Sequence, residues 1–136
     1  MANIDDVRAI ALALPEAEES VSGHTGDAAW RLKSGQFAWL RGPSATDLRQ
    51  LAELGRDWPA GTVLAVRVAD LEEKDALLAA EPDVLFTIPH FDGYPGLLLR
   101  LDGIDRDRLT EIVTDAWLAR APSRVAKKWL AERGLE

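Results

Sequence analysis

Residues 83–101, DVLFTIPHFDGYPGLLLRL, decide the fold of this chain. Two apolar runs, 84–88 and 96–101, flank a loop that contains two prolines and a glycine. Short apolar runs bounded by turn residues are typical of buried strands. We therefore predict two strands here, and the second, centred on Leu97–Leu99, is expected to be a central strand of a sheet.

Further strands are expected nearer the N-terminus. Trp30 and Leu32 alternate with Arg31 and Lys33, the period-two pattern of a strand with one buried side. The connection Ser34-Gly35 predicts a hairpin to the next strand. The three expected strands span 28–33, 36–41 and 62–69, and residues 16–27 before them are expected to form a loop.

Apolar residues spaced by three and four positions predict helices at both ends of the chain and between the strands. In the helix expected over 44–55, Leu48, Leu51 and Ala52 are predicted to face inward. Helices at both ends with strands between them favour an α+β fold, an antiparallel sheet with helices packed on one face. The 136 residues are expected to form a single domain, 1–136. The other expected helices span 4–15, 70–80, 105–117 and 122–130.

The composition removes several classes of function. The chain has no cysteine and two histidines, which excludes disulfides, thiolate metal sites and cysteine nucleophiles. It contains no Gly-x-Ser-x-Gly, no Walker sequence and no Gly-x-Gly-x-x-Gly. We therefore expect no catalytic centre, cofactor or metal. The N-terminus lacks signal-peptide features, and no apolar run approaches about 18 residues. A cytoplasmic protein that does not enter membranes is expected.

The net charge of −7 is unevenly distributed along the chain. Residues 28–69 carry six basic and three acidic residues, and residues 119–136 carry five basic and two acidic residues. Residues 1–27 and 70–118 are strongly acidic. The total charge is therefore a poor guide to either surface, and a local cationic face is compatible with an acidic protein.

The basic residues of the hairpin and of the last helix are candidates for contact with nucleic-acid phosphates. At 100° per residue the basic side chains of the last helix fall within about 100° of arc, opposite Val125 and Trp129. The alternative is that they are solvated surface charges. The candidate residues are Arg31, Lys33 and Arg41 on the hairpin, and Arg124, Lys127 and Lys128 on the helix.

The loop between the strands predicted at 84–88 and 96–101 is a second candidate site. His90, Asp92 and Tyr94 lie there beside a predicted central strand, and loops in such positions often carry function. They are hypothesised to share one concave surface. The competing interpretation, which we favour, is that Pro89, Gly93 and Pro95 shape a turn whose aromatic rings cap the core.

Several segments resemble the MmcQ/YjbR-like family. They are Leu14–Glu19, Arg31–Leu40, Asp83–Phe91 followed by Leu101-Asp102, Asp115–Trp117 and Ala121–Lys127. The resemblance covers nearly the whole chain and implies a small α+β fold with frataxin/CyaY-like topology. It also implies a proposed DNA-binding role in which two β-hairpins act as wings, and no catalytic residues. Residues 42–61 depart from the family pattern, because they exceed a simple turn after the first hairpin.

The expected function is therefore that of a non-catalytic binding protein, with DNA as partner and a regulatory role. The alternative is a small-molecule or protein-binding module that uses the His90–Pro95 loop and has no nucleic-acid role. The sequence specifies neither an oligomeric state nor a DNA target.

Overall fold

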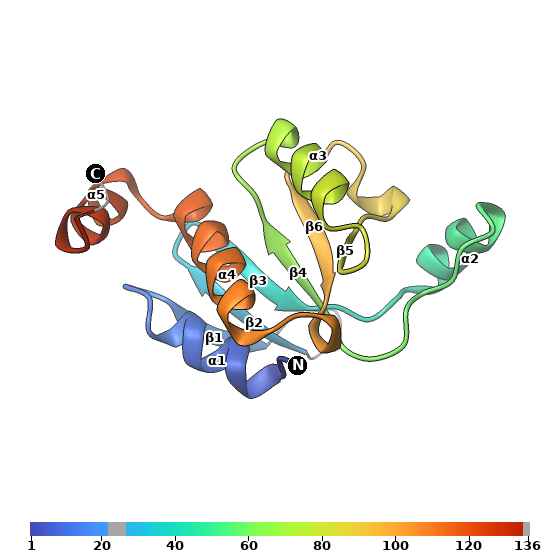
Figure 1. The fold of residues 1–136 in the computed structure, drawn as a ribbon, viewed down its shortest axis with the longest axis horizontal. Helices are drawn as coiled ribbons and strands as arrows, with labels where there is room; N and C mark the ends of the chain where they lie inside the picture. Colours follow the sequence, from blue (N-terminus) through green and yellow to red (C-terminus); the bar gives the residue numbers. More distant parts are fainter. Residues whose placement is uncertain (22–26, 135–136) are drawn as a thin grey trace.

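The computed structural model describes residues 1–21 and 27–134. Figure 1 shows its helices and strands. The α-helices are α1 (Ile4–Leu12), α2 (Ala45–Glu53), α3 (Leu71–Ala80), α4 (Arg106–Arg120) and α5 (Ser123–Glu132), with two 3-10 turns, η1 (Pro89–Phe91) and η2 (Leu101–Gly103). The strands are β1 (Glu18–Val21), β2 (Ala28–Leu32), β3 (Gly35–Leu40), β4 (Val63–Arg67), β5 (Leu85–Phe86) and β6 (Gly96–Arg100).

The strands form one antiparallel sheet in the order β1-β2-β3-β4-β6-β5. Strand β6 pairs with β4 on one side and β5 on the other, so the prediction of a central strand at Leu97–Leu99 is confirmed. A bulge in the β2–β3 pairing lets both Phe37 and Ala38 enter the main core. The predicted α+β class with an antiparallel sheet is confirmed.

Helices α1 and α4 pack against each other and cover one face of the sheet, with α4 lying across β3 and β4 (Figure 1). Alternate strand residues on this face, such as Leu64 and Leu99, join the main core. Trp30 from β2 and Trp117 from α4 are fully buried within it. The predicted inward stripe of α4 is confirmed, since Leu109, Ile112, Val113, Ala116 and Trp117 are all buried.

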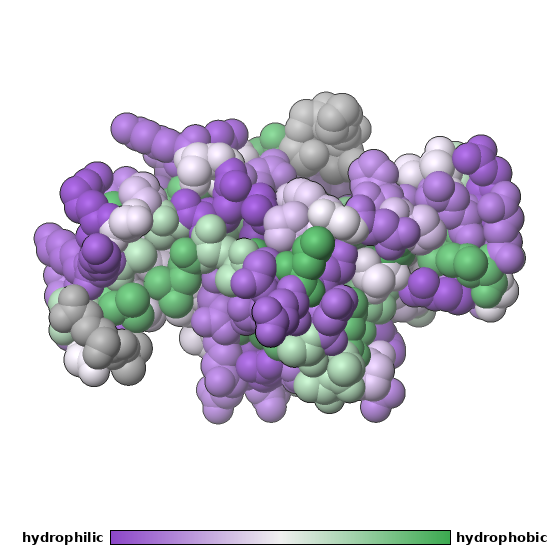
Figure 2. Space-filling view, turned by 90° about the horizontal axis from the view of Figure 1, so that it is seen from above, coloured by the Kyte–Doolittle hydropathy of each residue, from purple (hydrophilic) through white to green (hydrophobic). Residues whose placement is uncertain are grey.

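The opposite face of the sheet carries a second, smaller apolar cluster. Its strand residues include Ala65 and Leu98, and it is covered by Leu51 of α2 and Phe91 of η1. Helix α2 projects at one end of the molecule and α5 at the other (Figure 1). The prediction that Leu48 and Ala52 face inward is wrong, because Leu48 is 49% exposed and Ala52 is exposed as well, whereas Leu51 is buried as predicted. Among the described residues, Asp47 and Leu51 are the buried residues of α2, and Figure 2 shows apolar residues on its projecting end.

Two other expectations need correction. Residues Glu18–Val21, expected in a loop, form the edge strand β1. Its side chains are mostly exposed, so the strand has no buried side and gives no alternating pattern. The hairpin turn is Lys33-Ser34, one residue earlier than predicted, and Gly35 begins β3 with a φ of 137°.

Candidate nucleic-acid interface

The rotation of α5 about its axis is fixed by its apolar side. Val125 and Trp129 are buried, and the Trp129 ring lies 5.5 Å from that of Trp117 on α4, centroid to centroid. Because these residues occupy one side of the helix, Arg124, Lys127 and Lys128 are exposed on the other. The structure therefore presents the three basic residues of the last helix together at the surface.

The β2–β3 turn lies beside the end of α4, directly before α5. The Ser34 hydroxyl donates to the carbonyl oxygen of Arg120 at 2.8 Å, and the Arg120 guanidinium donates to the carbonyl of Ser34. Glycine is favoured at position 35 by its φ of 137°, and a Cβ there would also meet the end of the Arg120 side chain. Two basic segments far apart in sequence are thereby joined. We call Lys33, Arg124, Lys127 and Lys128 the cationic face.

Arg31 lies apart from the cationic face. Its side chain is exposed on the side of β2 opposite the buried Trp30 and Leu32, and its cross-strand neighbour is Glu18. Directly opposed residues of an antiparallel pair project on the same side of the sheet. Arg31 is therefore placed next to a carboxylate, on the sheet face away from the α4 layer.

Arg41 is also separated from the cationic face, because it follows β3 at the end of the strand away from Lys33. Six strand residues span about 20 Å. The Arg41 guanidinium contacts a carboxylate oxygen of Asp47 at 2.7 Å and lies 5.5 Å from the centroid of the Phe91 ring. The Asp47 side chain is 1% exposed. The structure thus gives Arg41 a buried ion pair.

Asp47 has a second role that sequence reasoning missed. It forms a capping box with Ser44 at the start of α2, in which each residue's side chain accepts from the other's backbone N–H at 3.0 Å. The spacing Ser44-x-x-Asp47 resembles the Ser-x-x-Glu capping pattern, so the sequence carried a signal for the cap. It carried none for the pairing with Arg41.

Lys74 of α3 anchors the His90–Pro95 loop. No sequence pattern indicated this role. Lys74 is 5% exposed and donates to the carbonyl oxygens of Phe91 at 2.6 Å and Tyr94 at 2.9 Å. Burial lowers the pKa of Lys74, opposed by the negative charges of Asp92 and Asp75. The loop is thus tied to the body through its backbone.

The side chains of the loop are arranged around an aromatic contact. The Tyr94 and Phe91 rings meet edge to face at 5.4 Å, and the Arg67 guanidinium lies 5.1 Å from the Tyr94 ring centroid. His90 and Asp92 are exposed. None of the four cavities described below is lined by His90, Asp92 or Tyr94.

Comparison with known proteins places the chain in a family. The YjbR family profile matches residues 12–119. This chain belongs to the YjbR family. Uncharacterized proteins of Mycobacterium tuberculosis and Mycobacterium bovis are each 40% identical to it over 134 residues, covering 98% of this chain and 100% of the relatives. The crystal structure of Deinococcus radiodurans protein DR2400, with domain DUF419, matches 100% of this chain and 91% of its own. The TM-score is 0.66 at 20% identity, which confirms the fold.

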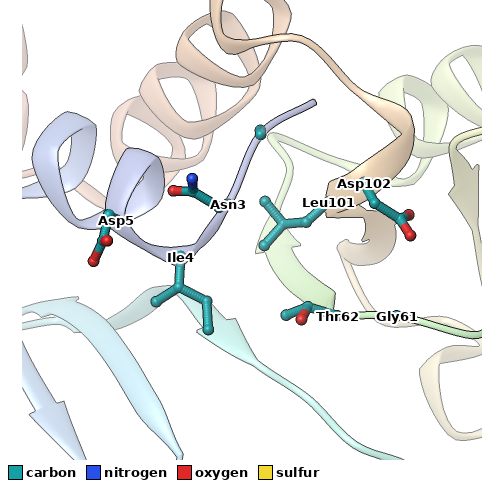
Figure 3. Close-up of a pocket in the computed structure, with 8 residues that line it drawn as sticks. Asn3, Ile4, Asp5, Gly61, Thr62, Leu101 and Asp102 are labelled. Atoms are coloured by element: carbon teal, nitrogen blue, oxygen red, sulfur yellow. The ribbon is translucent and has the colours of Figure 1, made fainter.

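The described part of this YjbR-family chain has surface cavities of different character. The largest described, about 540 Å³, lies between the start of α1 and η2. Figure 3 shows the carboxylates of Asp5 and Asp102 at opposite ends of it, pointing apart. A cavity of about 440 Å³ lies near Arg56 and Arg100, one of about 20 Å³ lies beneath α3 and α4, and one of about 200 Å³ lies along α5.

Two further features concern metals and membranes. Within residues 1–21 and 27–134, no three His, Asp or Glu side chains are grouped so that they could hold a metal ion. Among the same residues, no helix combines the length and the apolar character needed to cross a membrane.

Proposed function

We propose that this YjbR-family protein is a non-catalytic nucleic-acid-binding protein with DNA as its partner, acting in regulation. The observation that carries the proposal is the contact between Ser34 and Arg120, which brings Lys33 next to the α4–α5 junction. Basic residues from two remote segments therefore contribute to one cationic face. A surface of this kind is what phosphate recognition requires.

The proposed binding acts on phosphates and not on base stacking. Trp129, the tryptophan beside the cationic face, packs against Trp117, and the Arg133 guanidinium lies 4.1 Å from its ring centroid. A ring so engaged is a poor platform for a nucleic-acid base. We therefore expect weak sequence preference and strong dependence on salt, since phosphate contacts position a protein without reading the bases.

The acidic segments of the protein support one orientation on DNA. Residues 70–118 carry twelve acidic and four basic residues, so they are repelled by a polyanion. The α5 end carries the opposite charge. An uneven charge distribution of this kind steers association and suppresses wrong orientations. An acidic protein can thus approach DNA through its cationic face.

The test compares two double variants, each of which removes two positive charges. Replacing Lys127 and Lys128 by Ala removes half of the cationic face. The control R49A/R56A removes two exposed charges in α2 and just after it, together with the hydrogen bond from Arg56 to the carbonyl oxygen of Thr87. Affinity for a labelled duplex is measured by fluorescence anisotropy across a salt series. We expect K127A/K128A to bind more weakly and to lower the steepness of log K against log salt by about two units.

The control variant should retain the slope of the parent protein. Both variants should stay folded, because exposed substitutions usually change stability by about 0.5 kcal/mol. If K127A/K128A binds as tightly as the parent with the same slope, the cationic face is the wrong one. If a panel of DNA and RNA shows no binding at low salt, the nucleic-acid proposal fails and the His90–Pro95 loop becomes the next surface to test.

A further inference from the structure

A cleft of about 200 Å³ runs between α5 and the Pro15-Glu16 turn that follows α1. We call it the α5 cleft. Arg124, Lys128 and Trp129 line it from the helix, so it borders the cationic face. The cleft is therefore formed by the same helix that carries the proposed phosphate contacts, but it also includes a buried aromatic side chain.

Trp129, which lines this cleft, carries an indole N–H that has no partner among the described residues. Trp129 is 8% exposed, and its Nε1 atom is buried without an acceptor among the described residues. The neighbouring Trp117 differs, because its Nε1 donates to the carbonyl oxygen of Pro15 at 3.0 Å. An indole N–H can only donate, and buried donors in native structures nearly always have a partner. The Trp129 group therefore lacks an acceptor that a ligand could supply.

The charged groups around Trp129 favour a negatively charged ligand. Arg124 and Lys128 lie one helical turn apart on the cleft wall, and the Arg133 guanidinium lies against the Trp129 ring. The carboxylates of Glu16 and Glu132 also border the cleft, and both residues are exposed. The lining itself thus carries two cations and two anions, and Arg133 beside the Trp129 ring adds a third positive charge next to the cleft.

The start of α5 adds to this preference. Its N-cap is Pro122, which makes no side-chain cap, and its first turn contains no acidic residue. Helices α1, α2, α3 and α4 each have a side-chain cap. Uncapped N–H groups and the helix dipole favour an anion near the first turn, where Arg124 lies.

We infer that the α5 cleft holds one phosphate group of the bound nucleic acid. The Trp129 indole donates to a phosphate oxygen, and the exposed side chains of Arg124 and Lys128 fold around the group and balance its charge. The inference rests on the proposed function and adds to it a specific neutral donor. Free inorganic phosphate has the same chemistry as a backbone phosphate, so the experiment must separate the two sources.

The experiment follows the five indole N–H signals of the parent protein by ¹⁵N-resolved NMR, after resonance assignment. The protein is titrated with a DNA duplex, with inorganic phosphate, and with chloride at matched ionic strength. We expect DNA to shift the Trp129 signal downfield, phosphate to shift it at higher concentration, and chloride to leave it in place. A signal that DNA does not move would overturn the inference.

The affinity of W129F for DNA provides a second readout. The variant removes the N–H but no charge, so we expect about tenfold weaker binding with an unchanged salt slope, unlike K127A/K128A. W58F, at the other end of the molecule, is the matched control and should bind as the parent does. If W129F also binds as the parent while the parent shows a steep salt slope, the α5 cleft is not used and the proposed function stands. If phosphate shifts Trp129 but no nucleic acid binds, both the proposed function and the nucleic-acid role of the cleft fail, and the cleft is assigned to free phosphate.

Discussion

Replacing Asp47 by Ala should destabilise the protein more than removing the helix cap of α2 alone. One carboxylate oxygen of Asp47 accepts from the Arg41 guanidinium at 2.7 Å and from the Ser44 backbone N–H at 3.0 Å. The substitution removes both bonds and leaves the guanidinium without its partner. The Arg41 side chain is 15% exposed, so water compensates for only part of the loss.

The expected cost follows from these two contributions. Breaking a buried ion pair by removing one partner costs about 3–5 kcal/mol. The lower end applies here, because the Nε atom of Arg41 and the second carboxylate oxygen of Asp47 are already unpaired within the described residues. We expect D47A to lose about 3 kcal/mol, and S44A, which removes only the cap made by its hydroxyl, about 1 kcal/mol. With a urea m-value of about 2 kcal/mol per M, the D47A midpoint falls by about 1.5 M.

The assay is equilibrium urea unfolding of D47A, S44A, R41A and the double variant R41A/D47A. The double-mutant cycle should give a coupling energy of about 1–3 kcal/mol between Arg41 and Asp47. A D47A loss no larger than that of S44A, with no coupling, would show that the ion pair adds nothing to the cap. R41A should also keep the salt slope of DNA binding. A less steep salt dependence of DNA binding for R41A would show that Arg41 is part of the binding surface.

Two further predictions concern pH. Burial lowers the pKa of Lys74 in the folded state below its ordinary value of 10.5. Between the folded-state pKa and 10.5 the unfolded state therefore binds more protons than the folded state, so the stability of the fold increases as pH rises toward 10.5. The stability advantage of the parent over K74M should therefore grow from pH 8 to 10.5 in urea unfolding, and a constant or shrinking difference would contradict this. The Arg108 guanidinium, hydrogen-bonded to Glu81, holds the pKa of that carboxyl below 4.5, so its stabilisation is present above 4.5 and is lost on acidification. E81Q should be less stable than the parent at pH 7 in thermal unfolding, with the gap closing near pH 3, whereas a gap independent of pH would show that the ion pair is not the cause.

Much of the fold could be predicted because its elements bury residues in regular patterns. The run around Leu97–Leu99 and the stripe of α4 both follow directly from apolar spacing. The edge strand β1 could not be predicted, because its side chains are mostly exposed and its sequence therefore has no alternation of apolar and polar residues. Leu48 was misassigned for a related reason. Helical spacing shows which side of α2 is apolar, but only the tertiary structure shows how little of that side is covered.

The candidate site was predicted in part. Lys127 and Lys128 could be placed on the surface of α5 because Trp129 and its neighbours define the buried side. Arg41 looked equivalent to Lys33 in sequence, since both are basic residues next to hairpin strands. The ion pair of Arg41 forms because the chain folds back after β3 and brings Asp47 of α2 beside it. No local sequence pattern encodes this arrangement. The buried Lys74 was missed for the same reason, because its acceptors are carbonyl oxygens of a distant loop.

The turn at Lys33-Ser34 links the fold to the proposed function. A cationic stripe on α5 alone offers three charges on a helix that protrudes from the body, and such residues are often only solvated. The contact of Ser34 with Arg120 fixes a fourth charge beside the junction from which α5 begins. Gly35, the residue after Ser34, has a φ of 137°, a backbone conformation that residues with a side chain rarely adopt. Lys33 is thus placed beside this junction by two contacts between Ser34 and Arg120, one made by the Ser34 hydroxyl and one by the Arg120 guanidinium.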